Sequence, residues 1–294
     1  VGTLEAQQFS TTTKLVGQTT MVVGANSFSA SEDDVADAAA GLSGATVFNY
    51  DLRLDLNTSF TGEDLLKTRL RAGNFAESEF DGANTGGAIG LNALEVAFGE
   101  SGDEDEVTVD RLYYQFPIGD DFTGTFGAKV RQDDMLAVWP SNYPSDTILD
   151  VFTYAGAPGA YSLTLGGGGG IWWENDGGFS VSASYVSSNA DDGNPNTGGV
   201  ATDGAGSNAT AQIAYSADQW GLAAAYSYTS GDNGAGLYGG NATPAVLAYT
   251  DQGTSNSIGV SAWWMPEESG FIPSVSTGWG YNTVSPNDRI NPDV

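Results

Sequence analysis

The chain has 294 residues, with 9 basic and 37 acidic side chains, a formal net charge of −28, and neither cysteine nor histidine. The missing Cys and His exclude thiol nucleophiles, zinc fingers and the ordinary Ser-His-Asp triad, and the negative charge argues against a nucleic-acid partner, which needs a basic surface. The 41 glycines and the many aromatic residues suit turns and pleated strands, so an all-β protein is expected.

Segments of alternating polarity predict about eleven strands along the chain. In chain order they cover residues 9–24, 46–60, 65–75, 107–117, 122–131, 161–173, 179–188, 208–216, 220–229, 257–264 and 271–281. Most are close to the ten residues or so of a tilted membrane strand, whereas ordinary strands average about five or six. Apolar runs are shorter than the roughly eighteen residues of a membrane helix, so a membrane location requires a closed barrel.

The connections between these segments alternate in length. Short turns follow positions 60, 117, 173, 215 and 265, and the long tracts, many of them rich in Gly, Asp and Asn, are residues 27–44, 76–106, 132–160, 189–207 and 231–256. Short turns at one end and long loops at the other are typical of an outer-membrane barrel. A soluble sandwich also mixes loop lengths, but rarely with this regularity.

The basic residues are expected on the polar faces of the strands. Eight of the nine precede position 132, namely Lys14, Arg53, Lys67, Arg69, Arg71, Arg111, Lys129 and Arg131. A charge on the lipid side of a barrel strand costs about 2–4 kcal/mol at mid-bilayer, so strict segregation is expected there. A soluble sandwich segregates charge as well, so this pattern supports a membrane barrel without requiring one.

The segment Trp220–Thr229 favours the membrane interpretation. Trp220, Leu222, Ala224, Tyr226 and Tyr228 share one face, and small or polar residues occupy the other. Trp220 and Tyr228 are about 26 Å apart along the strand, or roughly 20 Å across the membrane after a tilt of about 40°. We expect this strand to face lipid on its aromatic side and a wet lumen on the other.

Three N-terminal stretches carry a family resemblance. "LEAQQFSTTTKL", "FTGEDLLKTRLRAGNF" and "DRLYYQFPIGDDFTGTFGAKV" resemble cyanobacterial outer-membrane porins that carry an S-layer-homology domain and are related to OprB-type carbohydrate porins. The resemblance covers most of residues 4–131, and "GGGGGIWWENDGGFSVSASYV" fits a later hairpin less tightly. It implies a transmembrane antiparallel β-barrel of about sixteen strands, usually trimeric, preceded by a signal peptide, a cell-wall-binding domain and a coiled-coil linker. About eleven strands and no terminal aromatic residue suggest further C-terminal strands.

The candidate site is a positive ladder on one wall of the lumen. Its predicted pore-lining residues are Arg53, Lys67, Arg69, Arg71, Arg111, Lys129 and Arg131, balanced by Asp51 and Asp55, with Tyr113 as an inward ring. Facing acidic residues from a long loop, this wall would favour anions or small polar solutes; alternatively, these side chains only hold strand register. The apolar loop Gln132–Ala160 is expected either to fold into the pore, with Asp133 and Asp134 facing the cavity, or to pack against a neighbouring subunit or loop.

Other motifs predict no chemistry. "LGGGGGIWW" has no following helix to make a nucleotide site, and "SGDEDE" and "NADDGNPN" lack the EF-hand pattern, so solvated acidity is the simpler interpretation. Nothing places Glu104 and Asp105 across a substrate cleft. No cofactor, metal or enzymatic activity is expected.

The sequence therefore predicts one barrel domain over residues 1–294, located in the outer membrane of a Gram-negative-type bacterium. Its expected function is passive diffusion of small hydrophilic solutes, inorganic ions and possibly sugars, with membrane lipid and the cell wall as partners. The alternative is a secreted acidic β protein of a surface layer, with a structural or carbohydrate-binding role.

Overall fold

The computed structural model shows one antiparallel sheet of eleven strands, in which each strand pairs with its neighbours in sequence. The structure describes residues 12–80, 93–99, 105–146, 148–230, 253–268 and 270–286. The strands are β1 (Thr13–Gly24), β2 (Val47–Thr58), β3 (Leu65–Gly73), β4 (Thr108–Ile118), β5 (Phe122–Arg131), β6 (Leu165–Glu174), β7 (Phe179–Ser187), β8 (Ser207–Ser216), β9 (Trp220–Ser230), β10 (Gly253–Trp264) and β11 (Val275–Pro286). This confirms the all-β prediction.

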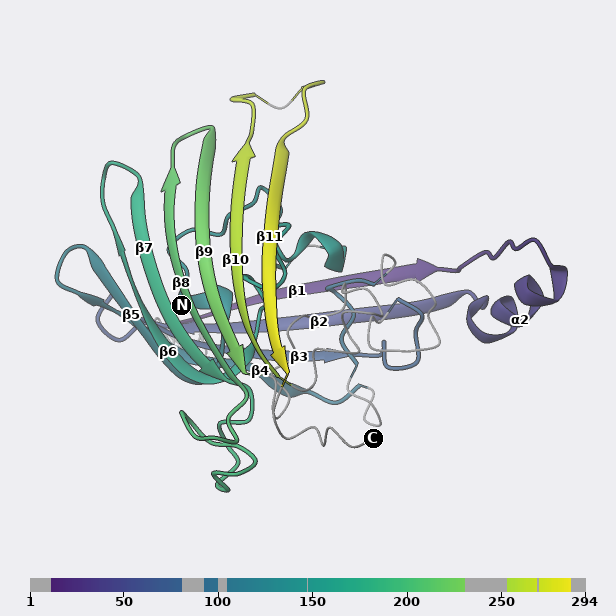
Figure 1. Cartoon of the computed structure of the whole chain (residues 1–294), viewed down its shortest axis with the longest axis horizontal. Helices are drawn as coiled ribbons and strands as arrows, with labels where there is room; N and C mark the ends of the chain where they lie inside the picture. Colours follow the sequence, from purple (N-terminus) through teal and green to yellow (C-terminus); the bar gives the residue numbers. More distant parts are fainter. Residues whose placement is uncertain are drawn as a thin grey trace, which may run out of the picture.

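The sheet curves along its strand order. In Figure 1, β1 to β4 run nearly horizontally while β7 to β11 stand upright, and the segment between β5 and β6 passes across the hollow side. Within the described residues β1 pairs only with β2 and β11 only with β10, so the sheet has two free edges and is not closed. The expected total of about sixteen strands stays a prediction.

Short turns join the strands at one end of the sheet, as predicted. Gly62, Gly119 and Gly178 have positive φ angles in three of these turns, a conformation that glycine adopts without steric cost. In the turn before β3, one oxygen of Asp64 accepts hydrogen bonds from the Phe60 and Thr61 amides at 2.9 and 2.7 Å. The connection after β10 is longer than expected, since β11 begins at Val275.

A short helix interrupts one of the predicted loops. Residues 27–44 were expected to form a loop, whereas helix α2 covers Asp33–Ser43 and extends beyond the β1–β2 hairpin (Figure 1). Its alanines favour a helix, and Asp33 and Asp34 in the first turn complement the helix dipole. Two 3-10 turns, η2 (Gln132–Met135) and η3 (Asp150–Phe152), lie between β5 and β6.

The two faces of the sheet are buried in the reverse of the usual order. Along β9, Trp220 and Leu222 are 43% and 50% exposed, while Ser227 and Thr229 are 0% exposed. The same alternation of exposed apolar and buried polar side chains runs through β7 and β8. The inner face is therefore polar and covered, and the outer face is apolar and bare.

Aromatic side chains gather at the short-turn end of the outer face. Phe122 pairs with Trp173, Phe179 with Tyr215, and Trp220 with Trp264. Phe179, Tyr215 and Trp220 are also in ring contact, with centroids 4.8 and 5.2 Å apart. Tyrosines occupy outer positions towards the opposite end, including Tyr185, Tyr226 and Tyr281. Apolar residues such as Ile171, Val181, Ile213, Leu222 and Val260 lie between these two groups.

Candidate functional site

The segment between β5 and β6 crosses the inner face of the sheet. We call residues 132–162 the interior loop. At its start Gln132 is fully buried and hydrogen-bonds to Thr210 of β8. Further along, the Ala155 carbonyl accepts a 3.1 Å hydrogen bond from Ser261 of β10, and the Asn142 amide donates one of 2.8 Å to Ser276 of β11. Of the two placements considered for this loop, the structure therefore has the inward one.

Glycines let the interior loop approach the sheet closely. A side chain at Gly278 of β11 would lie 2.0 Å from the Ala155 carbonyl oxygen, and one at Gly170 of β6 would lie 3.1 Å from Cβ of Met135. The small residues of these strands therefore provide room for the loop against the inner face. The glycines of "LGGGGGIWW" therefore allow close packing against the loop.

Five arginines of β2 to β5 form a cluster on the opposite side, and four of them pair with carboxylates of the loop. We call them the arginine wall: Arg53, Arg69, Arg71, Arg111 and Arg131. All five are buried or nearly so, and each forms ion pairs with carboxylates. Arg71 binds Asp51 at 2.5 Å and donates to the Glu95 carbonyl at 2.9 Å. Buried guanidinium groups require such partners, because an unpaired buried charge is strongly destabilising.

Asp146 of the interior loop pairs with three members of the wall at once. Its carboxylate lies 3.3 Å from Arg53, 3.1 Å from Arg69 and 3.0 Å from Arg131, which belong to β2, β3 and β5. Burial opposes ionisation of this carboxyl, but the three guanidinium groups outweigh burial and hold the pKa of Asp146 far below its ordinary value of 3.8. Asp146 therefore stays ionised at neutral pH and holds the loop to three strands.

Three further acidic side chains surround the wall from outside the strands. Asp133 contacts Arg131 at 2.6 Å, Asp134 contacts Arg111 at 3.1 Å, and Glu95 contacts Arg131 at 2.9 Å. Burial raises the pKa of Glu95, and burial together with the charge of Asp133 raises that of Asp134. For Asp133, burial also opposes ionisation, but Arg131, together with Arg111 and Ser145, outweighs burial and lowers the pKa. Of these two adjacent carboxyls, Asp133 therefore ionises more easily than an ordinary aspartate, and Asp134 ionises less easily.

The inner face of β7 to β10 has a different chemistry. We call this surface the hydroxyl wall, and its buried residues are Ser180, Ser182, Ser184, Asn208, Thr210, Gln212, Ser227, Thr229, Ser255, Ser257 and Ser261. It has no charged side chain among these inward positions. Gln212 donates to the Tyr161 hydroxyl at 3.0 Å, and Ser182 accepts from the Ala137 amide at 3.0 Å. Neutral hydrogen bonds therefore hold this side of the loop.

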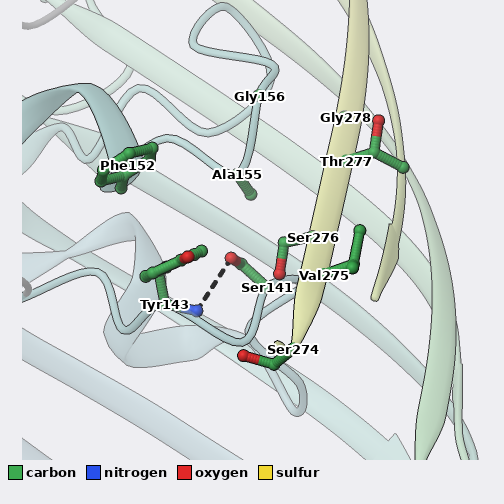
Figure 2. A pocket seen from close by; sticks show the side chains of 10 residues that line it. All are labelled: Ser141, Tyr143, Phe152, Ala155, Gly156, Ser274, Val275, Ser276, Thr277 and Gly278. Carbon is green, nitrogen blue, oxygen red and sulfur yellow. Dashed lines mark hydrogen bonds between the residues drawn. The ribbon is translucent and has the colours of Figure 1, made fainter. Parts of the chain in front are cut away.

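The interior loop does not fill the space in front of the last strand. A cavity of about 410 Å³ lies between loop residues 141–156 and β11. Figure 2 shows Tyr143 and Phe152 on the loop and Ser276 on the facing side of β11, whereas Thr277 points to the other side of that strand; the two loop rings stack with centroids 4.9 Å apart. Open volume thus remains beside the loop on the inner side of the sheet.

The structure assembles most of the predicted pore-lining residues. Arg53, Lys67, Arg69, Arg71 and Arg111 lie in register on β2, β3 and β4, with Arg53 opposite Arg71 and Arg69 opposite Arg111. Asp51 pairs with Arg53 and Arg71, and Asp55 pairs with Lys67 and Arg69. Arg131 joins the same cluster from the end of β5.

Lys129 was wrongly placed on this inner face. A register shift between Gly127 and Val130 adds a residue to β5, so Lys129 pairs with the outward-facing Leu112 and is exposed. Val130 points inward instead and is fully buried beside Met135. The bulge reverses the alternation on which the prediction relied.

Tyr113 points inward as predicted, but it offers little surface to a solute. It is 6% exposed and packs with Val130, Met135 and Val186. A stacking platform for sugars needs an open ring face, so the structure gives Tyr113 a packing position instead.

The wall is also less positive than the sequence suggested. The five arginines of the wall and the neighbouring Lys67 meet seven acidic side chains: Asp51, Asp55, Glu95, Asp110, Asp133, Asp134 and Asp146. The strand pattern missed Glu95 and Asp146 because both belong to long loops, and Asp110 because a bulge in β4 turns it inward beside Arg111. The apolar character of the interior loop was the signal that indicated inward packing.

The described residues contain no group of three or more acidic, His or Cys side chains able to hold a metal ion. Part of the acidic stretch 101–106, with Glu104, lies outside them. In the same part of the chain, no helix combines the length and apolar character required to cross a membrane.

No protein-family model matches the chain. Two cyanobacterial proteins are similar to it, both uncharacterized. One, from Nostoc sp., is 32% identical over an alignment covering 95% of this chain and 51% of the relative. The other, from Synechocystis sp., is 30% identical, covering 76% of this chain and 38% of the relative. The chain spans about half or less of the length of these relatives.

Proposed function

We propose that the protein is an outer-membrane porin of a cyanobacterium, through which small hydrophilic solutes diffuse without energy coupling. The observation that carries this proposal is the reversed burial of β7 to β9, with apolar side chains bare and hydroxyls covered. In water, a bare apolar face of this extent is costly and marks an interaction surface. In a bilayer it faces lipid, and the aromatic rows mark the two interfaces.

The inner face supports the same proposal. Thr125, Ser180, Ser184, Ser255 and Ser257 each have a buried side-chain oxygen with no hydrogen-bond partner among the described residues. Buried polar groups are nearly always paired with protein or water. We expect ordered water enclosed between the interior loop and the sheet to pair with them, beside a lumen that the interior loop narrows. This proposal includes the resemblance to cyanobacterial porins with an S-layer-homology domain, which agrees with the cyanobacterial origin of the relatives. It also includes trimer formation and attachment to the cell wall, which that resemblance implies.

The first experiment places a charge on the outer face at two depths. Ala224→Lys lies mid-strand on that face, whereas Gln219→Lys lies in the short turn. A lipid-facing position predicts a loss of about 2–4 kcal/mol in folding into liposomes for Ala224→Lys and about 0–1 kcal/mol for Gln219→Lys. Equal tolerance of both lysines in a protein that is soluble without detergent would favour the surface-layer alternative.

The second experiment tests the pore itself. Full-length protein reconstituted in a planar lipid bilayer is expected to give stepwise conductance, and the reversal potential under a salt gradient measures its ion preference. Stable insertion without any conductance would contradict the proposed function.

A further inference from the structure

The three arginines around Asp146 have the geometry of an anion site. Arg53, Arg69 and Arg131 come from three different strands and direct their guanidinium nitrogens at one carboxylate, at 3.3, 3.1 and 3.0 Å. Guanidinium groups hold carboxylates and other oxyanions by such charge-assisted bonds. In this protein the site is occupied by the carboxylate of Asp146 from the interior loop.

The arginines are fixed independently of that occupant. Arg53 also binds Asp51 at 3.3 Å, Arg69 binds Asp55 at 2.7 Å, and Arg131 binds Asp133 at 2.6 Å. The side chains of Arg53 and Arg131 are only 4% and 8% exposed, whereas that of Asp146 is 31% exposed. The three arginines are therefore held within the arginine wall, and Asp146 is the more accessible partner.

The charge of the site selects the class of occupant. Each of the three arginines already has one other carboxylate partner, so Asp146 adds a further unit of negative charge to the cluster. A doubly charged anion would add repulsion from Asp51, Asp55 and Asp133. The matching free ligand is a small monovalent oxyanion with the shape and charge of a carboxylate, of which formate is the simplest probe.

We propose that Asp146 is the residue that determines ion selectivity in the lumen, because it occupies as a tethered anion a three-arginine site that would otherwise bind a small monovalent oxyanion. This inference rests on the proposed porin function. With Asp146 in place, the wall offers no net positive binding site to a passing anion. Without it, the cluster is one unit less negative, and Arg53, Arg69 and Arg131 each lose one carboxylate contact.

The test uses Asp146→Ala in the full-length protein, reconstituted in planar bilayers. In a chloride gradient, the ratio of anion to cation permeability is expected to rise about fivefold, the effect of one charge at close range in water. Added formate is then expected to refill the site and return the ratio towards the wild-type value. Asp191→Ala removes the same charge from an exposed loop outside the cluster and is expected to change neither quantity.

Asp146→Asn keeps the shape of the side chain and removes only its charge. It is expected to raise anion preference without formate rescue, because the amide still occupies the site. An unchanged reversal potential in both folded variants would overturn the inference while leaving the porin function intact. If the wild-type protein forms no channel, the proposed function fails first. A selectivity change that formate does not reverse in Asp146→Ala would also overturn the three-arginine site.

Discussion

The two halves of the inner face hold the same loop by different means. The arginine wall binds it through charged pairs that converge on Asp146, Asp133 and Asp134, whereas the hydroxyl wall binds it through single neutral hydrogen bonds such as Ser261 to Ala155. A buried charge that loses its partner is strongly destabilising, whereas a buried hydroxyl that loses its partner costs less free energy. The charged half is therefore expected to fix the position of the loop and the neutral half to accommodate it.

Among the variants that test this difference between the two walls, Arg71→Met has the largest expected effect on stability. Arg71 shares the nearly inaccessible Asp51 with Arg53, and its loss leaves that carboxylate with one arginine. We expect a loss of about 3–5 kcal/mol in the free energy of unfolding, measured by urea titration of the detergent-folded protein. Lys67→Met is the matched control, since Lys67 is more exposed and has, within the described part of the chain, one ion pair, to Asp55 at 3.2 Å, worth at most about 1 kcal/mol. Equal losses would show that burial does not govern the strength of these pairs.

Gln132→Ala tests the link between the halves. Gln132 donates to the Ala160 carbonyl at 2.8 Å and accepts from the Leu163 amide at 3.0 Å, while fully buried. Unsatisfied buried groups cost about 1–3 kcal/mol each, so we expect a loss of about 3 kcal/mol. Gln115→Ala, which removes one bond to the Asp134 carbonyl, should cost about 1 kcal/mol. The same titration compares them, and the reverse order would contradict the assignment.

Ser261→Ala measures a single contact of the hydroxyl wall. It removes the hydrogen bond to the Ala155 carbonyl, and we expect a loss of about 1 kcal/mol. Ser257 lies on the same strand, β10, before Ser261. Ser257→Ala removes a hydroxyl without a partner among the described residues and should change the free energy of unfolding little. Urea midpoints of the two variants would test this difference, and a larger loss at Ser257 would place an additional contact there.

The smallest expected effect is that of pH between 5 and 8. Because the pKa of Asp146 is lowered, its contribution to stability is present above the ordinary value of 3.8 and is lost only as the pH falls through the lower folded value. We therefore expect constant single-channel conductance across this range. A step within it would instead assign control to Glu95 or Asp134, whose raised pKa values mean that their protonated forms are lost as pH rises.

Much of the sheet could be predicted because the alternation of polar and apolar residues along a strand is visible in the sequence alone. The strands near Trp220 and Arg69 show the pattern without interruption, and the short turns contain the glycines that they require. Lys129 was misplaced because a bulge leaves no mark in a polarity pattern. Asp146 was not singled out because two of its three arginine partners, Arg69 and Arg53, lie 77 and 93 positions away in sequence, and only the fold brings them together.

The interior loop also sets an order of folding events. Its contact from Arg131 to Asp146 spans 15 positions, whereas Ser261 to Ala155 spans 106 and Asn142 to Ser276 spans 134. Contacts distant in sequence close late, because chain entropy must be lost before they form. The loop is thus expected to dock on the arginine wall while the last strands are still unpaired. Those strands then assemble against a loop that is already in place.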